Sequence, residues 1–545
     1  MSEDIFFMEL LRKSLALTAC ASLFLSGCGQ SSPSGPLPVT TQQLAIKHVV
    51  VIFDENISFD HYFATYPTAQ NNSGEPPFTA ATGTPTVNGL SGALLTANPN
   101  STNPANGAGA VNPFRLSPAQ ASTSDQDHDY TPEQMAYDGG AMDLFPESVG
   151  TPDTTMSGPG ATTGMTMGYF DGNTVTGLWN YAQNFSMSDN SFGTTFGPST
   201  TGAINLVSGQ TNGVSHTLNG TSAIVADGYG GYTVNGDPDP YNDICAGPTK
   251  NQVQMSGKSV GDLLTAANIT WGAFMGGFDL TATNTNGTTG CNRSTTSAVT
   301  GVTETDYIPH HAWFQFYGTT QNANHVRPAS VKAIGTNADG GANHQYDIND
   351  FYAAVAAGNL PSVNFLKAPG YQDGHAGYSD PLDEQAFIVT VVNTIEQSKF
   401  WDSTAIIIAY DDSDGWYDHV NNATVNGSAT AADVLNGNGI CGSPDTALAG
   451  TSATTLHPGG RCGYGPRLPL LVISPWAKPN FVDHTVTDQS SILRFIEDTF
   501  LSSARITGSF DSVAGPLTNM FNFSQPEPQN TNKPILDPTT GEPGS

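Results

Sequence analysis

The sequence feature that most constrains this fold is a short apolar run without alternation, at Ile46–Phe53. Its residues are mostly β-branched. Apolar side chains at successive positions indicate a strand that is buried on both faces, as in a parallel sheet. Similar runs recur at 405–409 and 468–473, with weaker ones at 269–275 and 363–366.

Helical patterns lie between these runs. Residues 384–397 and 488–500 carry apolar side chains three and four positions apart, and 350–357 is a shorter candidate. Residues 184–190 are expected to form a strand followed by a turn. Because strands alternate with helices, we expect the α/β class, with a mostly parallel central sheet flanked by helices.

Stretches rich in Gly, Asn, Thr and Pro interrupt this framework. None carries a periodic core of its own, so we interpret them as long loop insertions in a single catalytic domain at 45–524. The insertions cover about 66–122, 210–250, 278–305 and 421–460. The Pro-rich tail, 525–545, is expected to dock loosely or fray.

The N-terminus has the pattern of an export signal. Arg12 and Lys13 precede an apolar run, Leu15–Leu25, that is short for a membrane span. The run ends in Leu-Ser-Gly-Cys, which resembles a bacterial lipobox and predicts a lipoprotein signal peptide at 1–27 with lipid on Cys28. An ordinary secretory signal is the alternative.

A flexible tether at 28–44, with three prolines, would follow this signal. The protein is then exported, either to the periplasm, to the outer membrane as an anchored lipoprotein, or into the medium. We expect contact with a membrane only through the N-terminal lipid.

Four cysteines remain beyond the signal and the lipid site. An even number in an oxidising compartment predicts two disulfides. Three pairings are possible, and proximity in the sequence favours Cys245–Cys291 and Cys441–Cys462. A four-cysteine zinc site is the alternative, but the chain has no C-x₂-C pair.

The charge balance excludes nucleic acid as a partner. The chain has 17 Lys+Arg against 48 Asp+Glu, a formal net charge of −31, so it lacks the basic stripe of a nucleic-acid binder. Beyond the N-terminus no apolar stretch near 20 residues indicates a membrane span. With 38% hydrophobic residues, the chain can still bury a large core.

Two acidic clusters directly follow two predicted strands. Glu55 and Asn56 come after the first strand, and Asp411 and Asp412 come after the strand at 405–409. Ligands of parallel sheets bind at the carboxyl ends of the strands, and carboxylate and amide oxygens suit hard cations. The alternative is acidic turns that cap helices. The second cluster is no EF-hand, because residue 423 is Ala where that loop needs Glu.

Ser199 is the candidate nucleophile. It lies in Gly197-Pro198-Ser199, just before an apolar stretch at 203–207, and the N-terminus of a helix attracts phosphate. The alternative is that Ser199 only caps this helix. The run Gly-Pro-Ser-Thr-Thr-Gly is one residue too long for a G-x-S-x-G elbow, which counts against an α/β-hydrolase.

Four histidines in polar, turn-rich segments are the third set of candidates. An imidazole can clamp phosphate oxygens or protonate a leaving oxygen, and a structural role is the alternative for each. They are His128, His310, His311 and His375.

Four long motifs carry a family resemblance. They are His48–Phe63, Tyr410–His419, Gly465–Trp476 and Val482–Glu497. In that order they resemble the bacterial phosphoesterase family that contains phospholipases C and the respiratory-burst-inhibiting acid phosphatases. The resemblance implies an alkaline-phosphatase-like fold and attack on phosphorus assisted by one divalent metal ion, whose identity the motifs leave open.

The resemblance also implies roles for particular residues. Ser199 would be both the nucleophile and a metal ligand, and the four histidines match the phosphate side of the family's site, with either His310 or His311 facing the phosphate. Ile57 is a departure, since many members have Arg at this position. The other metal ligands would be Glu55, Asn56, Asp411 and Asp412.

We therefore expect an exported, metal-dependent phosphoric-ester hydrolase of the acid phosphatase or phospholipase C type, with a phosphoserine intermediate on Ser199. The substrate would be a small phosphomonoester or a phospholipid headgroup. Two alternatives are a non-catalytic surface lipoprotein on the same fold and a serine carboxylic-ester hydrolase.

Overall fold

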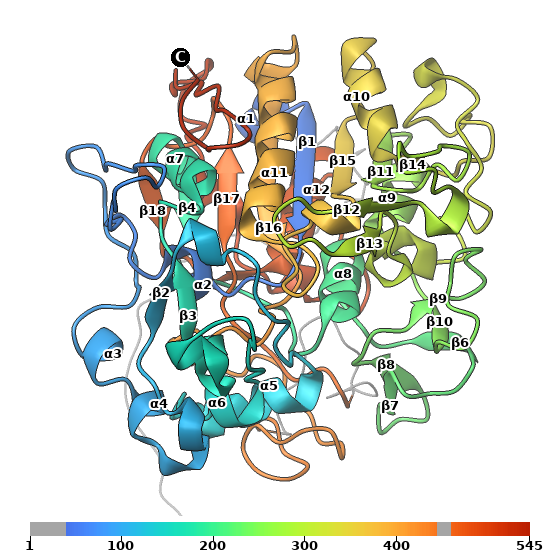
Figure 1. Ribbon diagram of the computed structural model, residues 1–545. Helices are drawn as coiled ribbons and strands as arrows, with labels where there is room; N and C mark the ends of the chain where they lie inside the picture. Colours follow the sequence, from blue (N-terminus) through green and yellow to red (C-terminus); the bar gives the residue numbers. More distant parts are fainter. Residues whose placement is uncertain (1–39, 444–458, 545) are drawn as a thin grey trace, which may run out of the picture. The chain divides into compact units, whose positions relative to one another are not determined.

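A sheet of eight strands forms the centre of the structure (Figure 1). The computed structural model describes residues 40–443 and 459–544. The strands from β14 to β16 are parallel to one another, whereas β17 is antiparallel to both β16 and β4. This confirms the predicted α/β fold with a mostly parallel sheet. In spatial order the strands are β14 (Gln345–Asp347), β11 (Trp271–Met275), β15 (Val363–Lys367), β1 (His48–Asp54), β16 (Thr404–Tyr410), β17 (Leu470–Ile473), β4 (Ser186–Ser188) and β18 (Phe481–Asp483).

Helices cover both faces of this sheet, which explains why its strands show no alternation. Figure 1 shows α11 in front of β1 and β16 and α12 behind them. The helices α7 (Thr176–Asn184) and α10 (Ile348–Ala356) pack against α11 (Pro381–Glu396). The helices α8 (Ser199–Ser208) and α9 (Val260–Ala266) pack against α12 (Gln489–Phe500).

Capping side chains set the beginnings of the predicted helices. Asp488 caps α12 by accepting from the backbone N–H of Ser490, so this helix begins where the pattern predicts. Asp380 caps α11 in the same way, and the helix therefore begins three residues before the predicted position. The edge strands β14 and β18 were not predicted, because three residues are too few to show a pattern.

The insertions form small elements around the carboxyl edge of the sheet. In 66–122 these are α3 (Ala93–Thr96), α4 (Pro99–Thr102) and β2 (Phe114–Leu116). In 210–250 they are β6 (Val214–Leu218), β7 (Ile224–Ala226), β8 (Tyr232–Val234) and β9 (Asp239–Pro240), with β10 (Gln252–Met255) just beyond. In 278–305 they are β12 (Ser294–Thr296) and β13 (Thr303–Thr305). Of the fourth insertion, residues 444–458 lie outside the described residues.

A second, smaller hydrophobic cluster lies beside the main core. It packs side chains of α5 (Tyr130–Tyr137) and α6 (Phe145–Ser148) against Phe196 and Tyr417. Further short elements are α2 (Phe59–Phe63), which packs on β3 (Gly168–Phe170), and the paired strands β5 (Ser191–Phe192) and β19 (Thr487–Asp488).

Both disulfides have the pairing that proximity in the sequence favours. Cys245 is bonded to Cys291, which joins the insertions 210–250 and 278–305. Cys441 is bonded to Cys462 and lies in the smaller hydrophobic cluster.

A buried arginine holds three loops together. The guanidinium of Arg467, which is 0% exposed, donates to Asp60 at 3.0 Å and to Asp418 at 2.9 Å. It also lies over the ring of Phe59, 4.2 Å from the centroid, and its backbone oxygen accepts from the N–H of Phe59. The loops after β1 and β16 therefore share one buried cation.

Both ends of the described chain pack on helices. Residues Thr41–Ala45, at the end of the predicted tether, form α1, and the side chain of Gln42 donates to Thr499 of α12. In the tail, Leu536 is 2% exposed and Asn393 of α11 bonds both its N–H and its carbonyl group. The tail therefore docks more firmly than its composition predicts. The predicted signal peptide 1–27, its Cys28 and the rest of the tether lie outside the described residues.

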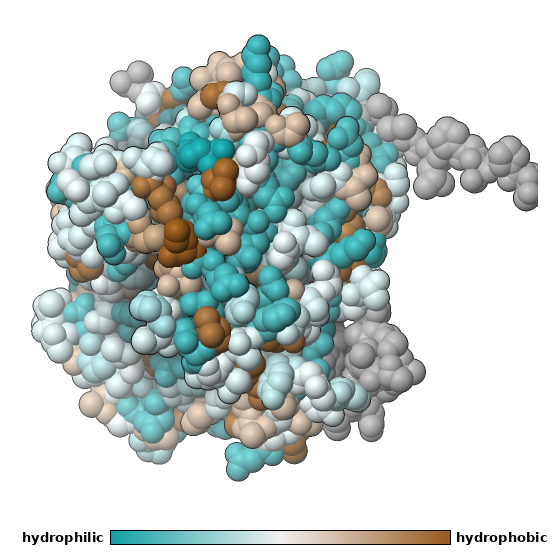
Figure 2. Space-filling view, turned by 90° about the vertical axis from the view of Figure 1, so that its right-hand side faces the viewer, coloured by the Kyte–Doolittle hydropathy of each residue, from teal (hydrophilic) through white to brown (hydrophobic). Residues whose placement is uncertain are grey.

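Figure 2 shows the face that carries β6, β9 and β10, where hydrophobic residues occur in small separate groups. Across residues 40–443 and 459–544, no helix has both the length and the apolar character required to cross a bilayer.

Glu396, the last residue of α11, gives a test of the packing. It is 0% exposed, and within the described part of the chain neither carboxyl oxygen has a hydrogen-bond partner. Burial raises the pKa of Glu396 to about 8. The folded protein therefore keeps a proton that the unfolded chain releases, and this group lowers stability as the pH rises from about 4.5 to about 8.

We expect Glu396→Gln to remove this dependence. The Tm of the variant relative to the native protein should rise by about 2 °C between pH 5.5 and pH 8 in thermal unfolding scans. Glu527→Gln, at an exposed position, is the control. A Tm difference that stays constant with pH would contradict a raised pKa at Glu396.

Candidate active site

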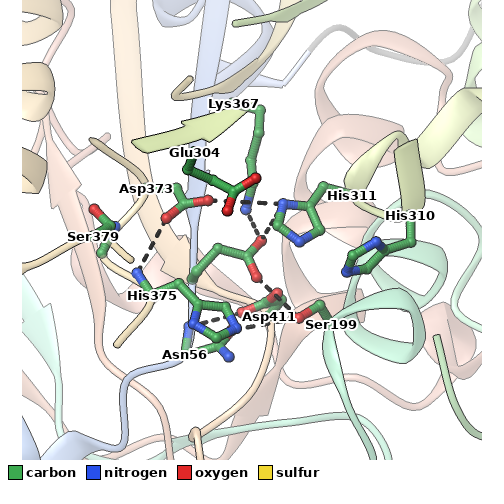
Figure 3. A network of polar contacts seen from close by, with 12 residues as sticks. Asn56, Ser199, Glu304, His310, His311, Lys367, Asp373, His375, Ser379 and Asp411 are labelled. Atoms are coloured by element: carbon green, nitrogen blue, oxygen red, sulfur yellow. Dashed lines mark hydrogen bonds and ion pairs between the residues drawn. The ribbon is translucent and has the colours of Figure 1, made fainter. Parts of the chain in front are cut away.

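The carboxyl ends of β1, β15 and β16 meet the N-terminus of α8 (Figure 3). Asn56 turns the chain out of β1 with a φ of 60°, a left-handed conformation that asparagine tolerates better than most residues. Its backbone N–H donates to Asp411 Oδ1 at 3.0 Å. This bond fixes the loop after β1 against the loop after β16, as the sheet topology predicts.

Ser199 points into these two loops. It is the first residue of α8, and Pro198 occupies the cap position, so the hydroxyl of Ser199 does not cap the helix. Ser199 Oγ lies 2.9 Å from Glu55 Oε2, 3.3 Å from Asp412 Oδ2 and 3.4 Å from Asn56 Oδ1. The five predicted metal ligands are thus brought together, since Asp411 bonds Asn56 directly.

The chemistry of this donor set fits a hard divalent cation. Three carboxylates, an amide oxygen and a hydroxyl converge, and all five residues are at most 3% exposed. Asp411 Oδ2 is buried without a hydrogen-bond partner among the residues described here, which leaves one oxygen for a ligand. Burial, and then the charge of Asp411, raise the pKa of Asp412 well above its ordinary value, so the cluster favours an added positive charge.

Glu55 has two further partners on its other oxygen. The buried ammonium of Lys367 bonds Glu55 Oε1, and His311 Nδ1 lies 3.2 Å from the same atom. Lys367 was not singled out from the sequence. The available signal is its position, because Lys367 directly follows the predicted strand at 363–366, is the last residue of β15 and so reaches the same sheet edge.

The four predicted histidines surround the cluster at different depths. His311 is 3% exposed and lies against Glu55, whereas His310 lines a cavity of about 650 Å³ together with His375. The rings of His128 and His375 are 5.7 Å apart, and His128 Nε2 is 3.3 Å from the Asn56 amide nitrogen. The two members of the pair His310–His311 therefore face different partners.

The charge states of these histidines differ for physical reasons. Burial lowers the pKa of His310, His311 and His375. Burial also acts to lower the pKa of His128, but the charges of Asp412, Asp414 and Asp125 outweigh it and raise that pKa well above its ordinary value. Of the four imidazoles, that of His128 therefore takes up a proton most readily.

Two further groups of side chains have the spacing of metal ligands. In each group the ligand atoms lie within 4.8 Å of one another. One consists of Glu55, His311 and Asp373, and the other of Asp125, His128, His375 and Asp414. Both groups adjoin the Ser199 cluster, because the first shares Glu55 with it and Asp414 of the second accepts from the side chain of Asn56 at 3.2 Å.

A larger cavity, of about 780 Å³, lies away from this cluster. Its lining includes Tyr66, Tyr169 and Arg115, and the guanidinium of Arg115 is paired with Glu75 at 2.6 Å and with Asp171 at 2.7 Å. Because it contains none of the candidate catalytic residues, volume alone does not identify the reactive site.

Ile57, where many relatives of this type have Arg, is 2% exposed and packs into the main core.

The sequence model of the phosphoesterase family matches residues 46–501, and the chain belongs to this family. Non-hemolytic phospholipase C of Pseudomonas aeruginosa is 33% identical over 178 residues, which cover 32% of this chain and 25% of the relative. Non-hemolytic phospholipase C of Burkholderia pseudomallei is 31% identical over 237 residues, 42% of this chain and 32% of the relative. These alignments therefore span a third or less of the two relatives.

A longer alignment joins this chain to phospholipase C A of Mycobacterium tuberculosis, with 22% identity over 91% of this chain and 81% of the relative. Among solved structures, a protein in the alkaline phosphatase superfamily from Vibrio parahaemolyticus covers 62% of each chain with 12% identity. Its TM-score of 0.27 is too low to establish a common fold.

Glu133 of α5 is a second residue that the sequence did not single out. It is 2% exposed, and its two oxygens accept from Ser413 Oγ at 2.7 Å and from the Gly197 N–H at 3.0 Å. One carboxyl group thus joins the loop of Asp411 and Asp412 to the turn before Ser199.

We expect Glu133→Ala to loosen this connection. The change leaves two buried donors unpaired, at a cost of about 1–3 kcal/mol each, so the Tm should fall by several degrees and activity should fall with it. Glu147→Ala, an exposed glutamate of the neighbouring helix α6, is the control. Equal Tm values for the two variants would exclude a bridging role for Glu133.

Proposed function

We propose that this chain is a metal-dependent phosphoric-ester hydrolase whose nucleophile is the hydroxyl of Ser199. The proposal rests mainly on the position of Ser199 Oγ. This atom, at the N-terminus of α8, lies within 2.9–3.4 Å of side-chain oxygens of Glu55, Asn56 and Asp412. Membership of the phosphoesterase family supports this proposal. So do the relatives whose names state a phospholipase C.

Glu55, Asn56, Asp411, Asp412 and Ser199 would hold the metal ion. When bound there, a divalent cation supplies a lowered pKa of the serine hydroxyl and charge neutralisation at the phosphoryl oxygens.

The residues of the chain account for the other parts of the reaction. Glu55 Oε2 accepts the hydrogen bond of the Ser199 hydroxyl at 2.9 Å and is placed to take its proton as the oxygen attacks phosphorus. The dipole of α8 favours an anion at its N-terminus, although the N–H of Thr200 already donates to Asp237 Oδ1 at 2.9 Å. His128, the histidine whose pKa is raised and whose ring lies 5.7 Å from that of His375, supplies the proton of the leaving alcohol, and water then hydrolyses the phosphoserine.

The leaving alcohol would lie in the cavity of about 650 Å³ beside His310 and His375. Charged residues of this cavity are Asp125, Asp239, Lys250 and Glu304. Such a lining suits a small polar alcohol. The names of the relatives favour a phospholipid, so the two substrate classes are best compared in one panel of phosphatidylcholine and small phosphomonoesters.

We further propose that the protein is exported, through a signal peptide at 1–27 with lipid on Cys28. The two disulfides support an oxidising compartment. Mass spectrometry of the mature N-terminus would separate a diacylated Cys28 from an ordinary cleaved signal.

Ser199→Ala tests the nucleophile. Because the hydroxyl is the attacking atom, turnover of p-nitrophenyl phosphate should fall about a thousandfold or more with little change in Tm. Ser208→Ala, at the other end of the same helix, is the matched control. Retention of a tenth of the native activity would remove Ser199 from this role.

Removal of the metal tests the donor cluster. Dialysis against EDTA should abolish hydrolysis and lower the Tm, because buried carboxylates would repel one another, and a divalent ion should restore both. A serine carboxylic-ester hydrolase would hydrolyse p-nitrophenyl acetate regardless of EDTA. A non-catalytic lipoprotein would show the Tm response without any turnover.

A further inference from the structure

The insertion 210–250 brings a lysine to the active site. Lys250 lies between β9 and β10, and its ammonium is 3.0 Å from His310 Nδ1 and 3.3 Å from Asp239 Oδ1. Asp239 is 2% exposed and also accepts from the N–H of Gly247 at 2.6 Å. The lysine is therefore held between a buried carboxylate and an imidazole, although nothing in the sequence motifs pointed to it.

The backbone around Lys250 is fixed from two sides. The disulfide Cys245–Cys291 joins its segment to the insertion 278–305. Asp243 accepts from Tyr307 Oη at 2.8 Å and from Gln315 Nε2 at 2.6 Å. Lys250 thus reaches the cavity from an anchored loop.

His310 is placed next to the nucleophile by its own backbone. The turn Pro309–His311 packs on α8, and the carbonyl oxygen of His310 accepts from Thr200 Oγ1 at 3.4 Å. Figure 3 shows His310 beside Ser199. In the described part of the chain, His310 Nε2 has no hydrogen-bond partner, and the ring lines the cavity.

The contact with Lys250 determines where the proton of His310 lies. An ammonium group has only N–H donors and no lone pair, so His310 Nδ1 must accept. In the neutral imidazole the single hydrogen is then on Nε2. An imidazolium would set an N–H against an N–H, so this contact also disfavours the charged form.

We propose that Lys250 is a positioning residue that fixes the Nε2–H tautomer of His310 and so presents a neutral donor to a phosphoryl oxygen at Ser199. The contact between His310 and a phosphoryl oxygen rests on the proposed function, whereas the assignment of the tautomer does not. Burial and then the charge of Lys250 lower the pKa of His310, which also favours the neutral imidazole. The other titratable groups that face His310 are Asp239, His311, His375 and His128.

The tautomer is measured directly by ¹⁵N–¹H correlation spectra of the protein with labelled histidine, assigned with His310→Ala. We expect an Nε2–H signature for His310 in the native protein and in Lys250→Arg, which keeps a donor-only cation. In Lys250→Met the nearest charged partner of Nδ1 is Asp239 Oδ1, at 3.9 Å, so the hydrogen should move to Nδ1. An Nδ1–H signature in the native protein, or no change in Lys250→Met, would overturn the proposal.

Kinetics on p-nitrophenyl phosphate test the consequence. Lys250→Met should lower kcat about tenfold with KM within twofold, and Lys250→Arg should restore kcat to within about threefold of the native value. Lys258→Met, an exposed lysine in the next loop, should match the native protein.

Combining Lys250→Met with His310→Ala separates positioning from direct contact with substrate. If Lys250 acts through His310, the double variant should lose no more than His310→Ala alone. Multiplied losses, or a raised KM with unchanged kcat, would assign Lys250 to the substrate and overturn the proposal. If the native protein hydrolyses no phosphoester, the proposed function fails, and the spectra still decide the tautomer.

Discussion

The buried cation of Arg467 makes the rest of the active site possible. Its guanidinium pairs with Asp60, in the helix α2 that follows β1, and with Asp418, in the loop after β16, and the metal-ligand candidates Glu55, Asn56, Asp411 and Asp412 lie in the same two segments. A buried carboxylate without a partner is costly, so the two loops cannot separate without exposing or orphaning this pair. A structural ion pair thus holds the carboxylates proposed to bind the metal at a fixed spacing while contacting none of them.

The order of the strands in the sheet determines which residues meet at the site. Parallel strands place all their following loops at one edge, and the neighbours β1 and β16 bring two acidic clusters into contact there. The helix α8 then adds a hydroxyl whose position at the first helical residue, behind a proline cap, keeps it free for other contacts. Glu133 and Lys367 supply the remaining hydrogen bonds and charge.

The parts that could be predicted are those with a local signal. Apolar runs marked β1 and β16, and Asp488 marked the start of α12, because burial and capping act within a few residues. Lys250 and Glu133 had no such signal, since each acquires its role from partners about 60 residues or more away. Likewise, sequence left His310 and His311 equivalent, and only the packing of their turn on α8 sends one toward the cavity and the other toward Glu55.

The bond between Cys245 and Cys291 makes two separate insertions into one covalent unit. Lys250 comes from the first insertion and Glu304 from the second, and both line the cavity beside His310. Exchanging one insertion for a segment without its cysteine would break this cross-link. The two halves of this cavity wall are therefore covalently coupled, and a change in the backbone of one insertion is transmitted to the side chains that the other contributes.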